Sequence, residues 1–147
     1  MTKLRRITVR GIIYRNGKVF AQQLKGGRDY WCTPGGGVED GEPLLEGLHR
    51  EMIEETGIAP KIGRLLYVQQ YYDGEREYLE FFFHIENAKD YHTIDLTSTS
   101  HGPIEVEHCE FIDPKAENLL PAPLQTMDYE KFTSSVQPVV IMNQFGE

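Results

Sequence analysis

The chain has 147 residues, of which 39% are hydrophobic and 26% are charged. This length and composition are typical of one folded domain with its own core, so we expect a single domain over residues 1–147. The formal net charge of −8 argues against a nucleic-acid duplex as a partner, because duplexes are bound by basic surfaces. A small phosphorylated ligand is not excluded, since a bound metal ion supplies positive charge locally.

The cysteine content and the N-terminus bear on where the protein works. Cys32 and Cys109 are far apart in the sequence and show no CxxC spacing, which favours a reducing cytoplasm over a disulfide framework. Charged residues interrupt the apolar pattern near the N-terminus, so we expect no signal peptide. We expect no membrane partner either, because no apolar run approaches the roughly 20 residues that a spanning helix needs.

The first third of the chain predicts strands joined by turns. Residues 4–14 are rich in β-branched side chains and predict a strand, and Asn16-Gly17 predicts a hairpin turn. Residues 18–24 are then the returning strand. Residues 30–33 predict a short strand, and the glycines that follow predict an irregular loop over residues 35–41.

The middle of the chain predicts one helix followed by two strands. The helix is expected from Pro43, in its first turn, to about Thr56, with Gly57 as its C-terminal cap. Residues 65–72 and 78–85 predict two aromatic-rich strands, joined by the turn at Asp73-Gly74.

The last third is expected to hold a polar loop over residues 86–101, a strand over 104–112 and a second helix over 124–132. Together the elements predict an α+β fold, an αβα sandwich in which a mixed β-sheet lies between helices.

Three glutamates fall on one face of the predicted central helix. Glu51, Glu54 and Glu55 stand at positions i, i+3 and i+4, where neighbouring Cβ atoms lie roughly 5–6 Å apart. Like charges this close destabilise a bare helix. A divalent cation over the face would neutralise them, and hard cations such as Mg²⁺ prefer carboxylate and phosphate oxygens.

The surrounding residues follow a longer pattern. Gly36 is followed after five residues by Glu42, and after seven more by the run Arg50-Glu-Met-Ile-Glu-Glu-Thr-Gly-Ile58. This resembles the Nudix box, GX5EX7REUXEEXGU with U apolar, and every fixed position is filled. The resemblance is specific, and it implies a Nudix-type αβα sandwich for nearly the whole chain.

The resemblance also implies an activity: a Mg²⁺-dependent pyrophosphohydrolase, with Mn²⁺ as a possible substitute. Such enzymes cleave the diphosphate linkage of a nucleoside diphosphate joined to a group X, or of a nucleoside triphosphate, by water attack at phosphorus. The physical demand is that metal ions shield the anionic diphosphate and lower the pKa of bound water. The expected partner is therefore a small nucleotide or other diphosphate, and a homodimer is possible.

Roles carry over by position in the box. The resemblance implies that Glu51, Glu54 and Glu55 are metal ligands, with the Gly36 carbonyl as a further ligand. Glu54 and Glu55 are also expected to be catalytic. Arg50 is expected to orient the acids, with Glu42 as its structural partner. The backbone of Gly36 and Gly37 is expected to approach the metal and the phosphates.

The general base is left open between a glutamate of the box and one from a later loop. Glu105 and Glu107 share one face of the predicted strand over residues 104–112 and are the later candidates for a base or an extra ligand. The competing function is a nucleotide-sensing module of the same fold without turnover.

Other candidates favour structural interpretations. Tyr71, Tyr72, Tyr78 and the phenylalanines 81–83 are able to stack on a base, but the sheet core or a dimer interface is the simpler interpretation. Arg6, Arg10 and Arg28 are able to contact a substrate phosphate, but ordinary surface arginines are the simpler interpretation. The Cys32 thiol is expected to be buried.

Overall fold

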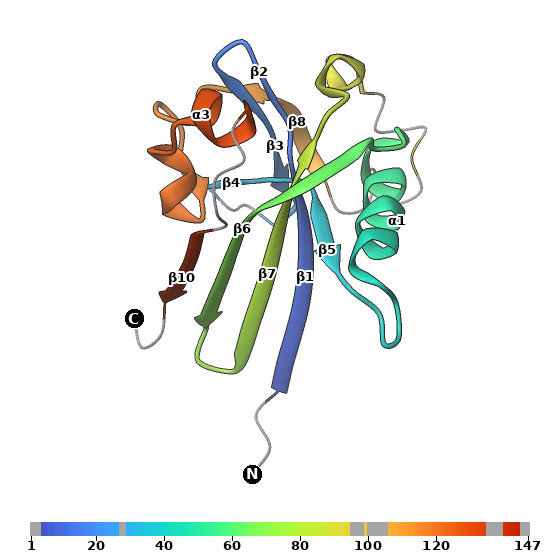
Figure 1. Ribbon diagram of the computed structural model, residues 1–147, viewed down its shortest axis with the longest axis vertical. Coiled ribbons are helices and arrows are strands. Elements are labelled where there is room, and N and C mark those ends of the chain that lie inside the picture. Colours follow the sequence, from blue (N-terminus) through green and yellow to red (C-terminus); the bar gives the residue numbers. More distant parts are fainter. Residues whose placement is uncertain (1–3, 27–28, 95–98, 100–105, 135–139, 145–147) are drawn as a thin grey trace.

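The structure is a computed structural model that describes residues 4–26, 29–94, 99, 106–134 and 140–144. Two mixed five-stranded sheets and the helices that lie beside them make up the fold (Figure 1). The elements are β1 (Leu4–Ile12), β2 (Tyr14–Arg15), β3 (Lys18–Leu24), β4 (Trp31–Cys32), β5 (Gly35–Gly37), α1 (Leu44–Thr56), β6 (Ile62–Tyr72), β7 (Arg76–Ile85), η1 (Ala88–Tyr91), β8 (Val106–Ile112), β9 (Leu119–Leu120), η3 (Ala122–Gln125), α3 (Tyr129–Ser134) and β10 (Val140–Gln144). The predicted α+β class is confirmed.

The first sheet has the strand order β10-β6-β7-β1-β5. β6 and β7 form the predicted antiparallel hairpin, and β1 pairs parallel with β7 along its whole length. On its other side β1 pairs antiparallel with β5, with Arg10 opposite Gly35 and Val9 opposite Gly36. Strand β1 therefore lies between the long aromatic strands and the glycine-rich segment.

The second sheet has the order β2-β3-β4-β9, with β8 also paired to β3. β2 and β3 meet at the predicted hairpin turn. Both turn residues have positive φ, 52° for Asn16 and 80° for Gly17, as the tightest hairpin turns require. The chain crosses from one sheet to the other at Ile13, so the predicted strand over residues 4–14 is two strands, β1 and β2.

Helix α1 packs on the first sheet through its apolar stripe. Leu48 and Met52 are fully buried against Val9, Phe20 and Ile85. The helix ends as predicted: Gly57 has φ 76° and its N–H donates to the Ile53 carbonyl at 2.9 Å. Pro43 is the N-cap and thus lies one residue before the helix.

Two predicted elements take a different form. The glycine-rich segment contains a short strand, β5, because Gly35 packs directly on β1: a Cβ on Gly35 would lie 2.0 Å from the Val9 carbonyl oxygen. The predicted second helix is split into η3 and α3. The Asp128 carboxylate accepts from the Lys131 N–H at 3.3 Å, so it starts a new helix instead of continuing the old one.

The ends of the polar loop and of the following strand are only partly described. η1 occupies part of the predicted loop, and residues 95–98 and 100–105 lie outside the described residues. Strands β9 and β10 had no counterpart among the predicted elements. Within the described residues, no helix has the length and apolarity needed to cross a bilayer.

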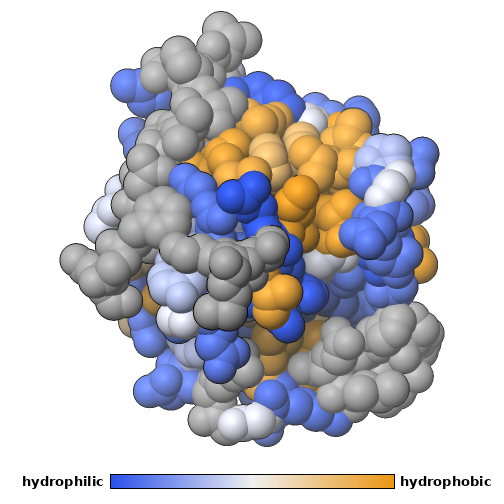
Figure 2. All heavy atoms as spheres, turned by 90° about the horizontal axis from the view of Figure 1, so that it is seen from below, coloured by the Kyte–Doolittle hydropathy of each residue, from blue (hydrophilic) through white to orange (hydrophobic). Residues whose placement is uncertain are grey.

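The end of the molecule where β1 begins carries exposed apolar surface. Leu4 is 62% exposed and Ile7 is 39% exposed. Figure 2, viewed from this end, shows apolar side chains gathered in a patch with hydrophilic side chains around it.

Candidate active site

Arg50 is the hub of the acidic end of α1. Its Nε and Nη2 atoms donate to the two carboxylate oxygens of Glu42 at 2.8 and 3.0 Å, a bidentate pair, and Nη2 also donates to the Gly37 carbonyl at 3.0 Å. The hydrogen bonds from Arg50, together with one from the Glu39 N–H, lower the pKa of Glu42 to about 2. Glu42 is therefore the structural partner of Arg50 in this geometry.

The same guanidinium also holds two of the three helix acids. Nη1 of Arg50 lies 3.0 Å from Glu51 Oε1 and 3.2 Å from Glu54 Oε2. One positive charge thus offsets part of the repulsion between these carboxylates. Four carboxylates, those of Glu42, Glu51, Glu54 and, at 4.0 Å, Glu39, surround one arginine, so the cluster keeps an excess of negative charge.

Glu55 is placed differently from its two neighbours. It is only 3% exposed, and its Oε2 atom accepts from Gln22 Nε2 at 2.6 Å and from the Gly35 N–H at 3.5 Å. Burial raises the pKa of Glu55 to about 8, although the Gln22 hydrogen bond and the charge of Arg10 act in the opposite direction. A buried carboxylate of this kind is stabilised as an anion by a cation placed beside it.

Gly36 lies directly against the acids. A Cβ at this position would come within 2.6 Å of both Cδ and Oε2 of Glu51, so a larger residue would displace that carboxylate from its present position. Gly36, Gly37, Arg50, Glu51, Glu54 and Glu55, the residues implied by the box, therefore form one contiguous region. The atoms expected to bind a metal ion, the carboxylates of the three glutamates and the Gly36 carbonyl, are all oxygens, which suits Mg²⁺ or Mn²⁺.

The acids do not converge on one point in this arrangement. Among the described residues, no group of three or more His, Cys, Asp or Glu side chains is arranged to hold a metal ion. Glu51 and Glu54 turn toward Arg50, while Glu55 turns toward Gln22. The residues fit a hard cation by chemistry, and side-chain rotation within the cluster would bring them to it.

The later-loop candidates for the base stand apart from this network. Glu105 lies outside the described residues. Glu107 is exposed on β8, and within the described part of the chain no hydrogen bond or ion pair links it to the glutamates of α1. Its role stays a prediction.

A cavity of 460 Å³ lies on the inner face of the first sheet, and sequence reasoning assigned it no site. Arg10 and Glu80 are joined there by a salt bridge at 3.0 Å. Tyr71 and Tyr78 are stacked in its wall, with ring centroids 4.7 Å apart and planes 5° apart. The signal that could have revealed it is the alternation of polar residues, such as Thr8 and Arg10, along strands that otherwise look buried.

This cavity adjoins the acidic region through its walls. Arg10 donates from Nη1 to the Thr33 carbonyl at 2.9 Å, just before the glycine-rich strand. Cys32, buried as expected and also in the cavity wall, donates its thiol to the Gln22 carbonyl, and Gln22 holds Glu55. Within the described residues, Thr33 Oγ1 is the one buried side-chain oxygen without a hydrogen-bond partner.

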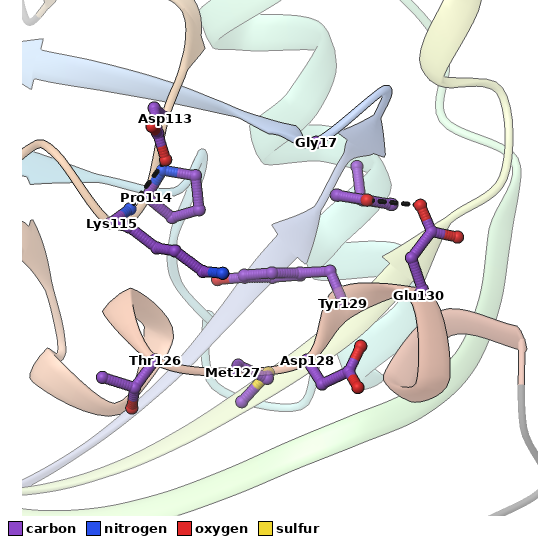
Figure 3. A pocket seen from close by; sticks show the side chains of 10 residues that line it. Gly17, Asp113, Pro114, Lys115, Thr126, Met127, Asp128, Tyr129 and Glu130 are labelled. Carbon is purple, nitrogen blue, oxygen red and sulfur yellow. Dashed lines mark hydrogen bonds between the residues drawn. The ribbon is translucent and has the colours of Figure 1, made fainter.

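A second cavity, of 520 Å³, lies beside α3 (Figure 3). Tyr14 donates its hydroxyl to Glu130 at 2.5 Å, and the rings of Tyr14 and Tyr129 stack with centroids 5.4 Å apart. Its charged side chains are of both signs, and no residue of the range 36–58 lines it. We therefore assign the chemistry to the acidic region and not to this cavity.

Comparison with known proteins decides the family. A family model described as NUDIX domain matches residues 4–132. The chain belongs to this family. Phosphatase NudJ of Escherichia coli O1:K1 / APEC is 30% identical over 118 residues, which cover 79% of this chain and 72% of that protein. Membership indicates a hydrolase that acts on phosphorus-containing acid anhydrides.

Two other similarities are more limited. RNA pyrophosphohydrolase of Haemophilus influenzae (strain PittEE) is 41% identical over 46 residues, which are 31% of this chain but only 24% of that relative. The solution structure of the E. coli ORF135 protein superimposes with a TM-score of 0.69 at 22% identity, covering 92% of this chain and 96% of that one. The structural likeness supports the Nudix fold and does not identify a substrate.

Proposed function

We propose that this chain is a Mg²⁺-dependent pyrophosphohydrolase that cleaves the diphosphate linkage of a nucleoside diphosphate-X or a nucleoside triphosphate by water attack at phosphorus. The observation that carries the proposal is the network in which Arg50 joins Glu42, Glu51, Glu54 and the Gly37 carbonyl. The family of the chain and the all-oxygen donor set support the same conclusion.

The contacts support the following proposed roles. Glu51, Glu54 and Glu55, with the Gly36 carbonyl, would hold Mg²⁺ or Mn²⁺. The cation would shield the diphosphate and lower the pKa of a bound water. Arg50 holds the carboxylates of Glu51 and Glu54 close to each other in the metal-free arrangement, from which both would rotate toward the cation. Glu54, Glu55, Glu105 and Glu107 remain the candidates for accepting the proton of the attacking water.

The acidic region and the adjoining cavity of 460 Å³ suggest how a substrate would lie. The diphosphate would lie over the acidic end of α1, and the adjoining cavity lined by Arg10, Tyr71 and Tyr78 would take the nucleoside. The short match to RNA pyrophosphohydrolases is insufficient to assign their substrate to this chain.

We infer three further properties from weaker support. The whole of residues 1–147 would form one domain. A cytoplasmic location is supported by two free cysteines, Cys32 and Cys109, as expected in a reducing compartment. A homodimer is supported by the exposed apolar side chains of Leu4 and Ile7.

The test is phosphate release from a panel of nucleoside triphosphates, dinucleoside polyphosphates, ADP-ribose and nucleotide sugars with Mg²⁺ or Mn²⁺. We expect Glu54→Gln to lower kcat by roughly two to three orders of magnitude, because one preorganised charge at the reacting centre is lost. Glu46→Gln is the matched control, since Glu46 is an exposed glutamate of the same helix.

Two outcomes would contradict the proposal. One is equal activity of Glu54→Gln and the wild type. The other is tight binding of one nucleotide without turnover of any substrate in the panel, which would favour the nucleotide-sensing module.

A further inference from the structure

Among the described residues that line the cavity on the inner face of the first sheet, Arg10 is the one with a cationic side chain. The cavity is also lined by aromatic and apolar side chains, among them Tyr30, Tyr71, Tyr78, Leu24 and Leu120. A planar ring would therefore find apolar and aromatic walls there, with one arginine among them.

The hydrogen bonds of Arg10 leave much of its guanidinium unused. Nε donates to Glu80 Oε2 at 3.0 Å and Nη1 donates to the Thr33 carbonyl at 2.9 Å. A guanidinium carries five N–H donors in a planar fork. Among the described residues Nη2 has no hydrogen-bond partner, and the side chain of Arg10 is 21% exposed. Because Arg10 lines the cavity, these remaining donors are available to a ligand.

The acceptors beside Arg10 are already occupied. Glu80 accepts from Thr8 Oγ1 at 2.8 Å and from Arg10 on one oxygen, and from Gln69 Nε2 at 2.6 Å on the other. Both Glu80 and Gln69 are nearly fully buried, at 4% and 2% exposed. This wall of the cavity therefore offers hydrogen-bond donors but few acceptors, and the charge of Arg10 is balanced by Glu80.

We propose that Arg10 is a specificity-determining residue that selects 6-oxopurine over 6-aminopurine nucleotides by donating to the adjacent O6 and N7 acceptors of the base. The inference rests on the proposed function and names the substrate class within it. An arginine fork matches this pair of acceptors bidentately. Adenine presents an amino group where O6 would be, so the N–H donors of Arg10 would face another donor. Uracil offers O4 without an adjacent ring-nitrogen acceptor.

The charge balance between Arg10 and Glu80 argues against a phosphate group as the ligand of this cavity. A phosphate entering the cavity would bring negative charge to a pair whose net charge is zero, and burying an unbalanced anion is costly. The phosphates belong with the cation at the acidic end of α1. The cavity is left for a neutral ring.

The ligand-side test compares ITP with ATP, because inosine and adenosine differ only at the 6-position and the neighbouring N1 proton. We expect kcat/KM to be about tenfold to a hundredfold higher for ITP, and for GTP, than for ATP. Calorimetric binding of IMP and AMP should show the same order. Equal values for ITP and ATP in both measurements would overturn the proposal without any variant being made.

The protein-side test uses Arg10→Lys, which keeps the positive charge beside Glu80 but replaces the fork with a single ammonium. We expect the preference for ITP over ATP to fall to within about threefold, through kcat/KM for ITP. The matched control is Arg5→Lys, because Arg5 pairs with Glu77 at 2.8 Å across the same two strands, on the opposite face of the sheet. An undiminished preference in Arg10→Lys would overturn the proposal.

The result also separates this inference from the proposed function. A protein that binds IMP over AMP but hydrolyses no nucleotide would refute the hydrolase and keep the role of Arg10. A protein that hydrolyses ITP and ATP equally well would keep the hydrolase and refute the role of Arg10.

Discussion

Two arginine–carboxylate centres differ in the balance of their charges. Arg50 is surrounded by the carboxylates of Glu42, Glu51 and Glu54, so that centre keeps a negative excess. Within the described residues, Arg10 forms an ion pair with one carboxylate, that of Glu80, whose oxygens also accept from Thr8 and Gln69. The first arrangement is suited to attract a cation. The second is neutral and presents directed donors, which suits the selection of an uncharged group.

The largest effect should come from breaking the Arg10–Glu80 pair with its hydrogen-bond partners Thr8 and Gln69, which we call the neutral centre. We expect Arg10→Met to lower the free energy of unfolding by about 3 kcal/mol, because it leaves the Glu80 carboxylate buried without its counter-charge. The double variant Arg10→Met/Glu80→Gln should recover at least half of that loss. Urea unfolding of the wild type and both variants measures this. A double variant no more stable than the single one would show that Glu80 does not depend on the charge of Arg10.

An intermediate effect, counted per unit of pH, should appear in the pH dependence of the metal-free protein. The pKa of Glu55 is about 8 in the folded chain against an ordinary 4.5, so the folded state binds this proton more tightly than the unfolded state. The free energy of unfolding should therefore fall as pH rises from about 4.5 to about 8, by up to about 1.4 kcal/mol per pH unit.

The matched measurement for this slope is Glu55→Gln, which removes the titrating group. Its free energy of unfolding should change less with pH over the same interval. Millimolar Mg²⁺ should flatten the wild-type slope by binding the ionised form. Parallel slopes for the wild type and Glu55→Gln would contradict the burial argument.

The smallest effect should come from a third arginine–glutamate pair, Arg5 with Glu77. The contact is as short as those in the two centres, 2.8 Å, but the side chain of Arg5 is 66% exposed. Because solvent screens such a pair, Arg5→Ala should change the free energy of unfolding by less than about 0.5 kcal/mol. A loss as large as that of Arg10→Met would mean that burial does not distinguish the pairs.

The acidic centre could be predicted from the sequence because its members are close in the chain. Helical periodicity places Glu51, Glu54 and Glu55 together, and the box fixes Arg50 and Glu42 around them. The helix and its Gly57 cap follow from the same local pattern. These features depend on spacing within one segment, which the sequence states directly.

The neutral centre could not be predicted because its partners are far apart in the chain. Glu80 reaches Thr8 and Arg10 only through the parallel pairing of β1 with β7, and sequence patterns do not give such a register. The Gln22–Glu55 contact likewise joins a strand of the second sheet to α1. The split between η3 and α3 was missed because Asp128 was placed within a helix instead of at its start.

The pairing of β1 with β5 links the positions of the two centres. Arg10 is opposite Gly35 and Val9 is opposite Gly36, so one strand step, about 3.3 Å, separates the pairing that carries the cavity arginine from the one that carries the glycine beside Glu51. A slip of one residue would turn Arg10 to the other face of the sheet. In one direction the slip would also bring Pro34 in place of Gly35 against the Val9 carbonyl oxygen, where there is no room for a Cβ. The same slip would therefore disturb both the position of Arg10 in the cavity and the acidic centre beside Gly36.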